Sequence, residues 1–182
     1  MNIKTSQNCP LQIGELQVNT GQGFLGLTLC PGKKDLGRHW DRDLNIDLQA
    51  IKTWGATTVV TLIEDHEFAM LHVEALGHAV GVLGMEWIHL PIVDVSIPDN
   101  RFENGWVTKG PKLHARLDAG ERILIHCRGG IGRAGLVAGL LLVERGANPI
   151  AAIARIRKAR PNAIETAHQE SYLQVKNRET SY

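Results

Sequence analysis

A cysteine and an arginine lie six positions apart in a glycine-rich segment, and these residue types at this spacing suit phosphate chemistry. The segment reads His126-Cys127-Arg128-Gly129-Gly130-Ile131-Gly132-Arg133. Its three glycines allow consecutive backbone N–H groups to turn toward one centre without a Cβ clash. The final arginine adds two parallel N–H donors that match phosphate oxygens. The segment therefore predicts a loop that binds a tetrahedral anion through Arg128, Gly129, Gly130, Ile131, Gly132 and Arg133.

Cys127 lies at the entrance of this predicted loop and is the candidate nucleophile. Donors that bind phosphate also stabilise a thiolate, so we expect the sulfur to be ionised at neutral pH. A thiolate beneath a phosphoryl group is positioned for in-line attack. The alternative is a cysteine that is merely buried at the end of a strand. Chance would produce the pattern in about one of several thousand chains of this length, which favours the nucleophile.

A phosphatase reaction also needs a proton donor for the leaving oxygen, and a carboxylic acid on a loop suits that task. Asp94 and Asp99 both lie in the proline-containing segment 91–100. Asp99 has another interpretation, because Pro-Asp-Asn commonly caps a helix, here one that begins near Arg101. His126 is expected to order the loop by hydrogen bonding rather than to act as a base.

The elements around the cysteine segment must position it. Residues 122–126 (RILIH) and 57–63 (TTVVTLI) are continuous apolar or β-branched runs, which predict buried strands. Residues 134–145 predict an apolar helix that ends at Gly146. Strands that alternate with helices predict a single α/β domain over residues 1–182, with a mostly parallel central sheet flanked by helices. Ligands of such sheets bind beyond the carboxyl ends of the strands, where Cys127 follows residue 126.

The other elements follow from periodicity and turn residues. The first 30 residues predict two short strands, as a hairpin at the sheet edge, and CPGKKDLGRHW (30–40) predicts a loop. Helices are expected over 41–54, over 68–83 as one unit, and from Asn148-Pro149 to about 160 and 166–178. A short strand is expected over 86–90. A helix over 101–119 should be interrupted at Gly110-Pro111.

Bulk properties set limits on partners and location. The chain has 182 residues and a formal net charge of +1, so no whole-molecule field attracts nucleic acid or a membrane surface. Its longest apolar run, 136–143, is too short to span a bilayer. With three widely spaced cysteines and no leader-like segment, a reducing cytoplasmic setting is expected. Pairing of Cys9 with Cys30 stays open.

The motif resembles the signature of the protein tyrosine and dual-specificity phosphatase superfamily, Cys-x5-Arg after a histidine. The likeness is strongest to the kinase-associated phosphatase (cyclin-dependent kinase inhibitor 3) type. It extends to His89-Leu-Pro-Ile-Val-Asp94 with Ile97-Pro-Asp99, which is similar to the acid loop of that group, and to Arg160-Pro-Asn-Ala-Ile-Glu-Thr-Ala-His-Gln169. Cys30-Pro-Gly32 is similar as well, so the resemblance spans most of residues 25–175.

This resemblance implies a three-layer cysteine phosphatase architecture and hydrolysis through a phosphocysteine. It favours Asp94 over Asp99 as the general acid, because Asp94 follows Pro-Ile-x at a family-like distance from Cys127. It also implies that Gln169 places the hydrolytic water, although an exposed helix glutamine is the alternative. The family usually has Ser or Thr after the arginine, whereas this chain has Ala134. Loss of that hydroxyl predicts slower hydrolysis of the phosphoenzyme.

Among substrates, a phosphorylated protein is expected first, with phosphotyrosine and phosphoserine or phosphothreonine both open. Only Arg128 is basic inside the loop, which disfavours a polyphosphorylated lipid headgroup. Ala134 favours a second hypothesis, a phosphate-reading module that turns over poorly. A third is an enzyme for phosphorylated nucleotides, RNA ends or lipids. No metal or organic cofactor is implied, because the cysteine supplies the nucleophile.

Two polar clusters have ordinary interpretations beside functional ones. Arg155, Arg157, Lys158 and Arg160 form a basic run that predicts a solvated helix face, with a docking patch for an acidic partner as the alternative. The segment Glu64-Asp-His-Glu67 predicts a polar turn that opens a helix, rather than a metal site.

Overall fold

A five-stranded sheet forms the centre of the molecule, with the strand order β1-β2-β7-β5-β6. The computed structural model describes residues 2–180, and their side chains as far as residue 177. Strand β1 pairs antiparallel with β2, while the pairs β2–β7, β7–β5 and β5–β6 are parallel. The predicted edge hairpin and the mostly parallel sheet are both confirmed.

The elements of the sheet are β1 (Gly14–Gln17), β2 (Phe24–Thr28), β5 (Ala56–Thr61), β6 (Glu86–His89) and β7 (Arg122–His126). A separate two-stranded ribbon consists of β3 (Lys34–Asp35) and β4 (Trp40–Asp41), joined by the 3-10 helix η1 (Leu36–Arg38). The helices are α1 (Leu44–Trp54), α2 (Asp65–Met70), α3 (Leu76–Val82), α4 (Asn100–Asp118), α5 (Gly132–Glu144), α6 (Pro149–Ala159) and α7 (Ala167–Thr180).

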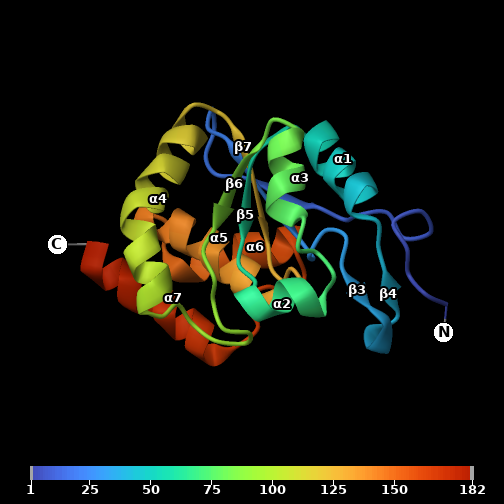
Figure 1. Ribbon diagram of the computed structural model, residues 1–182. Helices are drawn as coiled ribbons and strands as arrows, with labels where there is room; N and C mark the ends of the chain where they lie inside the picture. Colours follow the sequence, from blue (N-terminus) through green and yellow to red (C-terminus); the bar gives the residue numbers. More distant parts are fainter. Residues whose placement is uncertain (1, 181–182) are drawn as a thin grey trace.

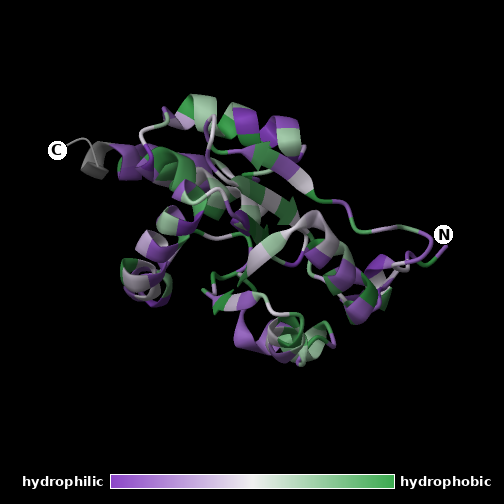
Figure 2. Cartoon of the chain, turned by 90° about the horizontal axis from the view of Figure 1, so that it is seen from above, coloured by the Kyte–Doolittle hydropathy of each residue, from purple (hydrophilic) through white to green (hydrophobic). Residues whose placement is uncertain are grey.

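Helices cover the sheet on both faces, which gives three layers (Figure 1). Side chains of α4, α5, α6 and α7 pack with one face of the strands in a large apolar cluster. Side chains of α1 and α3 form a smaller cluster with the other face. The central strands are largely apolar, and the helices show hydrophobic and hydrophilic stretches side by side (Figure 2). Within residues 2–180, no helix has the length and apolar character needed to cross a membrane.

Local sequence signals explain most helix boundaries. Asp43 accepts a hydrogen bond from the Ile46 N–H and so caps α1, which Gly55 ends at a φ of 95°. Asn148 caps α6 in the same way, and Pro149 occupies its first turn, where no N–H donor is needed. Glu64 and Glu67 form a reciprocal capping box at the start of α2. The prediction that this acidic segment opens a helix is confirmed.

The parallel strands end level with one another, and this edge positions the site. Thr28 of β2 pairs with His126 of β7, which pairs with Thr61 of β5, which in turn pairs with His89 of β6. Cys127 is the first residue after this row. The carboxyl edge of the sheet therefore holds the cysteine loop, as the sequence predicted.

Three predicted elements were wrong in detail. The helix expected over 68–83 is two helices, α2 and α3, because His72 adopts a left-handed φ of 55° between them. Helix α4 is not interrupted: Pro111 lies inside it, and the exposed Val107 lies one turn earlier, on the solvent side. The loop expected over 30–40 contains β3 and η1, and leads into β4.

Candidate active site

The loop from Cys127 to Arg133 joins β7 to α5 and curls around the cysteine sulfur. The N–H of Gly130 donates to Cys127 Sγ at 3.2 Å. Gly130 has a φ of 71°, and a Cβ there would overlap the backbone of Thr28 and Leu29. Only glycine fits that position. The Cys127 side chain is 3% exposed and forms part of a pocket of about 430 Å³.

Arg133 lies at the start of α5 and is 1% exposed. Its Nη1 and Nη2 donate to the two carboxylate oxygens of Glu67, at 2.6 and 3.0 Å. Nη1 also donates to the carbonyl of Ile92, at 3.0 Å. Burial acts to lower the pKa of Arg133, but the hydrogen bonds to Glu67 and the charges of Cys127, Glu67 and Asp94 raise it. The arginine is therefore a fixed cation.

One donor of Arg133 has no protein partner. Its Nε is buried and lacks an acceptor among the described residues. A buried N–H without an acceptor costs about 1–3 kcal/mol, so such groups usually serve a ligand or a water molecule. Nη2 donates to Glu67 and faces the Asp94 carboxylate, so a phosphate that made a forked contact with Nε and Nη2 would take the place of Asp94 on Nη2.

Asp94 lies beside this arginine, as a general acid would. Its Oδ1 is 2.8 Å from Arg133 Nη2, and its side chain is half exposed at the pocket wall. The next residue, Val95, has a φ of 59°, a costly conformation for a β-branched residue. Strain of this kind is concentrated at functional loops.

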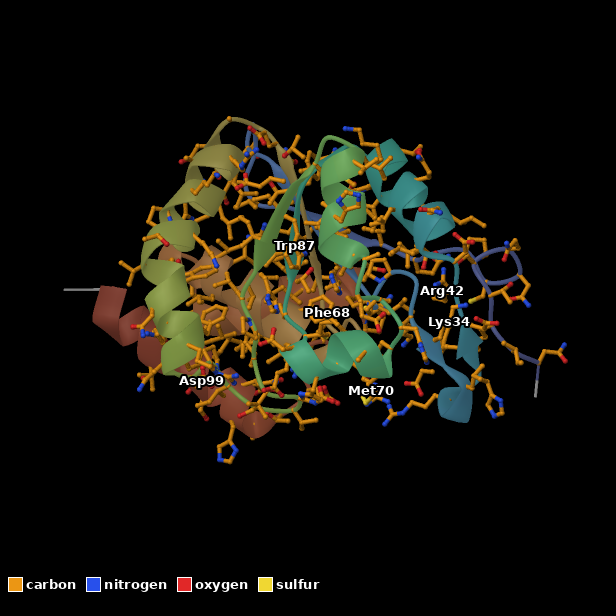
Figure 3. All side chains as sticks on the ribbon, viewed as in Figure 1. Lys34, Arg42, Phe68, Met70, Trp87 and Asp99 are labelled. Carbon is orange, nitrogen blue, oxygen red and sulfur yellow. The ribbon has the colours of Figure 1, made fainter. Side chains whose placement is uncertain are left out.

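Asp99 occupies a different place and has a structural function. Its Oδ1 accepts the N–H groups of Arg101 and Phe102 and so caps α4. The hydrogen bond from the Arg101 side chain is the largest cause of its lowered pKa. Figure 3 shows Asp99 at the end of α4, on the opposite side of the molecule from Arg42, which lines the pocket. The helix-cap interpretation of Asp99 is confirmed.

His126 is completely buried behind the nucleophile. Its Nε2 lies 2.8 Å from Thr61 Oγ1, which also accepts the indole N–H of Trp87 at 2.8 Å. Burial lowers the pKa of His126 to about 3, so the ring is neutral. Figure 3 shows Trp87 close to Phe68, with ring centroids 6.3 Å apart. The histidine thus belongs to a packed network that fixes the strand end, which agrees with the predicted ordering function.

Two cations hold the outward-facing carbonyls of the loop. Arg160 donates to the carbonyls of Gly129 and Gly130, at 3.3 and 3.1 Å. Lys33 Nζ donates to the carbonyl of Arg128, at 3.1 Å. Carbonyls that are fixed outward leave the loop N–H groups free to face the centre. The Arg128 side chain itself forms an ion pair with Asp35 at 2.8 Å, so this residue contributes to the loop through its backbone.

Gln169 does not line the pocket. Its side chain is completely buried, and its amide oxygen accepts the Glu165 N–H while its amide nitrogen donates to the Ser96 carbonyl. It therefore ties the acid loop to the segment between α6 and α7, and the alternative of an exposed helix glutamine is wrong. Glu165 lines the pocket instead, with its carboxylate against the Cα of Gly132.

Most of the basic run is committed to internal contacts. Arg155 donates to the carbonyls of Gln17 and Val18, and Arg157 to those of Ala163 and Ile164. Arg160 braces the loop as described above. Lys158 alone in this run has no ion pair or side-chain hydrogen bond among the described residues. All three cysteines are free.

Glu67 and Lys33 are site residues that the sequence did not reveal. Glu67 was interpreted as part of a helix-opening turn, and nothing local indicates that it pairs with Arg133, 66 positions away. Lys33 precedes the ribbon in a segment expected to be a loop. The capping-box spacing of Glu64 and Glu67 was the one available signal, because it places the second glutamate in a fixed first turn.

Comparison with known families agrees with this geometry. Residues 41–173 match the family described as "PTP-SAK: Swiss Army Knife protein, DSP-PTPase phosphatase domain". Cyclin-dependent kinase inhibitor 3 of Mus musculus is 33% identical over 172 residues, which cover 92% of this chain and 79% of that protein. Protein tyrosine phosphatase type IVA 3 of Mus musculus is 30% identical over 133 residues, which cover 72% and 70%.

Solved structures show the same architecture. Kinase associated phosphatase (KAP), in a crystal structure whose catalytic-site cysteine is replaced by serine, superposes with a TM-score of 0.83 and 28% identity, covering 94% of this chain and 97% of that one. Tk-PTP in its active form superposes with a TM-score of 0.68 and 24% identity, covering 91% and 97%. The second likeness concerns the fold alone. The predicted three-layer α/β architecture is confirmed.

Proposed function

Because this chain belongs to the dual-specificity and protein tyrosine phosphatase superfamily, we propose that it hydrolyses phosphate monoesters of proteins through a phosphocysteine on Cys127. The observation that carries this proposal is the sulfur at the pocket wall, where it accepts the Gly130 N–H. The buried guanidinium of Arg133 lies beside the candidate acid Asp94. Nucleophile, anion receptor and proton donor thus come together from three separate segments.

In the first step, Cys127 Sγ attacks phosphorus in line with the leaving oxygen. An S–P bond forms, the P–O bond breaks, and Asp94 gives its proton to the departing alkoxide or phenoxide. The loop N–H groups and Arg133 hold the equatorial oxygens while charge moves onto them. Glu67 keeps the guanidinium in place through two hydrogen bonds.

In the second step, a water molecule attacks phosphorus, the S–P bond breaks, and inorganic phosphate leaves. The Asp94 carboxylate accepts the water proton and is thereby reset for the next cycle. The buried position of Gln169 supports a positioning function for that residue rather than contact with the water. We propose that the Glu165 carboxylate, which lines the pocket beside Gly132, contacts this water instead.

A phosphorylated protein is the substrate class that the relatives support best. Their names refer to a kinase-associated phosphatase and to protein tyrosine phosphatases. Docking through Arg155, Arg157, Lys158 and Arg160 stays a prediction. It is weakened for the three arginines, because they donate to carbonyls of their own chain. Cytoplasmic location and the absence of nucleic-acid and membrane partners also stay predictions.

A phosphate-reading module is the second candidate, and Ala134 favours it. The side chain at this position is completely buried next to Arg133 and offers no hydroxyl to a departing thiolate. Such a module would bind the phosphoprotein and release it unchanged.

Hydrolysis of p-nitrophenyl phosphate separates the two candidates. We expect steady turnover by the purified chain, and loss of turnover in Cys127→Ser with phosphate binding retained. Ser171→Ala, at an exposed position of α7 outside the pocket, serves as a control. Phosphate binding by the unaltered chain without Cys127-dependent turnover would establish the reading module instead.

A further inference from the structure

The pocket beside Cys127 is larger than one phosphate group requires. Its volume of about 430 Å³ lies in the range of pockets that enclose whole small ligands, about 300–1,000 Å³. The cysteine loop forms part of its wall. The N-terminal segment, Lys33 and the ribbon of β3 and β4 also line it, through Pro10, Gln12, Lys33, Arg38 and Trp40. In Figure 1 this ribbon lies beside α2, at the N-terminal side of the molecule.

Lys33 is an unusual member of this wall, because it is a buried cation without a carboxylate partner. The residue is 4% exposed, and it forms no ion pair with any described residue. Its Nζ donates to one carbonyl, that of Arg128, and lies 4.7 Å from the ring centroid of Trp40. An ammonium carries three N–H donors, so the Lys33 ammonium has more donors than it has acceptors among the described residues. Burial lowers its pKa to about 8, against the opposing effect of the nearby Cys30 and Asp35.

Arg38 adds a second cation to the same wall. Its side chain is exposed, and it makes no hydrogen bond or ion pair within residues 2–177. The other cations nearby are already compensated. Arg42 forms a buried ion pair with Asp47, at 2.7 Å, and Arg128 forms one with Asp35. Lys33, Arg38 and Arg160 are therefore the pocket-lining cations without a carboxylate partner among the described residues, and Arg160 already donates to two loop carbonyls.

We propose that Lys33 and Arg38 form a second anion subsite, which binds an acidic side chain adjacent to the phosphorylated residue of a protein substrate. This inference rests on the proposed phosphatase function, and it names the sequence context that the enzyme selects. The ring of Trp40 lies against the Lys33 ammonium and holds the Lys33 side chain in place.

Lys33 lies close to the cysteine loop, because its Nζ donates to the carbonyl of Arg128. Lys33 and Cys127 line the same pocket, so a substrate whose phosphate lies over Cys127 can direct a neighbouring acidic side chain toward Lys33. Lys33, Arg38 and Trp40 also precede the segment 41–173 that matches the family. The subsite therefore lies outside that matched segment.

Matched phosphopeptides test the subsite. Phosphotyrosine and phosphothreonine peptides would carry Glu or Gln at both positions flanking the phosphorylated residue. We expect the unaltered chain to prefer the Glu peptide by about ten-fold in kcat/KM, as one charge-assisted contact provides. Lys33→Met and Arg38→Gln should each reduce this preference, and the double variant should bring it close to one. Lys33→Arg should retain it.

The controls distinguish this proposal from its alternatives. Lys52→Met removes an exposed cation of α1 outside the pocket and should leave the preference intact. An equal loss for Glu and Gln peptides would overturn the subsite, since Lys33 would then act only on the loop. The proposal would also be overturned if the Lys33 and Arg38 variants hydrolysed a phosphatidylinositol bisphosphate more slowly but kept the preference for the Glu peptide. The subsite would then bind a lipid headgroup. If Lys33→Met does not fold, the surface variant Arg38→Gln decides the question. Absent Cys127-dependent hydrolysis of p-nitrophenyl phosphate would instead refute the phosphatase function itself.

Discussion

Asp94 and Asp99 are five positions apart in one loop, yet their surroundings give them opposite functions. Asp94 is half exposed beside Arg133, where a proton can pass to a bound ester. Asp99 accepts two backbone N–H groups at the start of α4 and has no access to the pocket. At the scale of single residues, the partner of each carboxylate decides whether it acts in chemistry or in folding.

This difference predicts separate phenotypes for the two aspartates. Asp94→Asn should slow hydrolysis of a poor leaving group about 10²–10⁴-fold and remove the basic limb of the pH–rate profile. Asp99→Asn should keep the profile and most of the stability, because asparagine is also a good helix cap. Asp99→Ala should cost about 1 kcal/mol in the free energy of unfolding. A normal profile in Asp94→Asn, measured with an alkyl phosphate, would remove Asp94 from the role of acid.

Ala134 predicts which step limits turnover. Without a hydroxyl at this position, thiolate departure lacks about one hydrogen bond, about 1–2 kcal/mol, so the phosphoenzyme should accumulate. Rapid mixing with p-nitrophenyl phosphate should give a burst of product before the steady state. Ala134→Ser should shrink the burst and raise the steady-state rate. Fast turnover without any burst in the unaltered chain would show that the alanine is harmless.

At the scale of elements, the start of α2 and the start of α5 are joined by the buried ion pair of Glu67 and Arg133. Both side chains are almost inaccessible, at 2% and 1% exposure. Removal of one partner from such a pair leaves an uncompensated buried charge and usually costs about 3–5 kcal/mol. The pair therefore connects the stability of the fold to the orientation of the phosphate-binding arginine.

The pair also predicts how stability depends on pH. Burial acts to raise the pKa of Glu67, but the hydrogen bonds from Arg133 and the Glu64 backbone, together with the charge of Arg133, outweigh burial, and the net pKa is lowered. A carboxylate with a lowered pKa stabilises the fold above its unfolded pKa of about 4.3 and loses that contribution as the pH falls. In urea denaturation, the difference in the free energy of unfolding between the unaltered chain and Glu67→Gln should thus be large at pH 7 and decrease in acid. A difference that does not depend on pH would contradict this account of the pair.

Elements with a strong local signal were predictable, and elements set by distant contacts were not. The β-branched run of β5 and the pair Asn148-Pro149 predicted their elements from sequence alone. The helix expected from residue 41 begins at Leu44, because Asp43 caps it. The break between α2 and α3 depends on a left-handed His72, a residue with no strong preference for that conformation. Pro111 was expected to interrupt α4, but the helix continues through it.

The residues of the candidate site also differ in how far the sequence predicted their positions. The spacing of one motif predicted that Cys127 and Arg133 lie together, and the resemblance favoured Asp94. The structure places Asp94 against Arg133, with Cys127 at the same pocket wall, while their catalytic functions stay predictions. Gln169 was predicted to place the hydrolytic water or to be exposed, but its side chain is buried and donates to Ser96 in another loop. Glu165 and Lys33 reach the pocket only through tertiary packing. No pattern in the local sequence indicates these contacts.

At the scale of the whole molecule, the pocket is the meeting point of segments that are distant in the chain. The N-terminal segment and ribbon, the acid loop, the cysteine loop and the segment after α6 all contribute to its wall. A formal net charge of +1 gives the molecule little overall field, so anion recognition depends on local groups. The carboxyl edge of the parallel strands provides the common place where these groups meet.

The phosphocysteine is the species on which this account depends, and it can be observed directly. The chain would be mixed rapidly with a phosphomonoester, quenched in acid within the first turnover, digested, and analysed by mass spectrometry. We predict one phosphoryl group on the peptide that contains Cys127, formed at the rate of the product burst, and a persistent adduct in Asp94→Ala with an aryl phosphate. Turnover that proceeds while Cys127 stays unmodified at every time point would contradict the account.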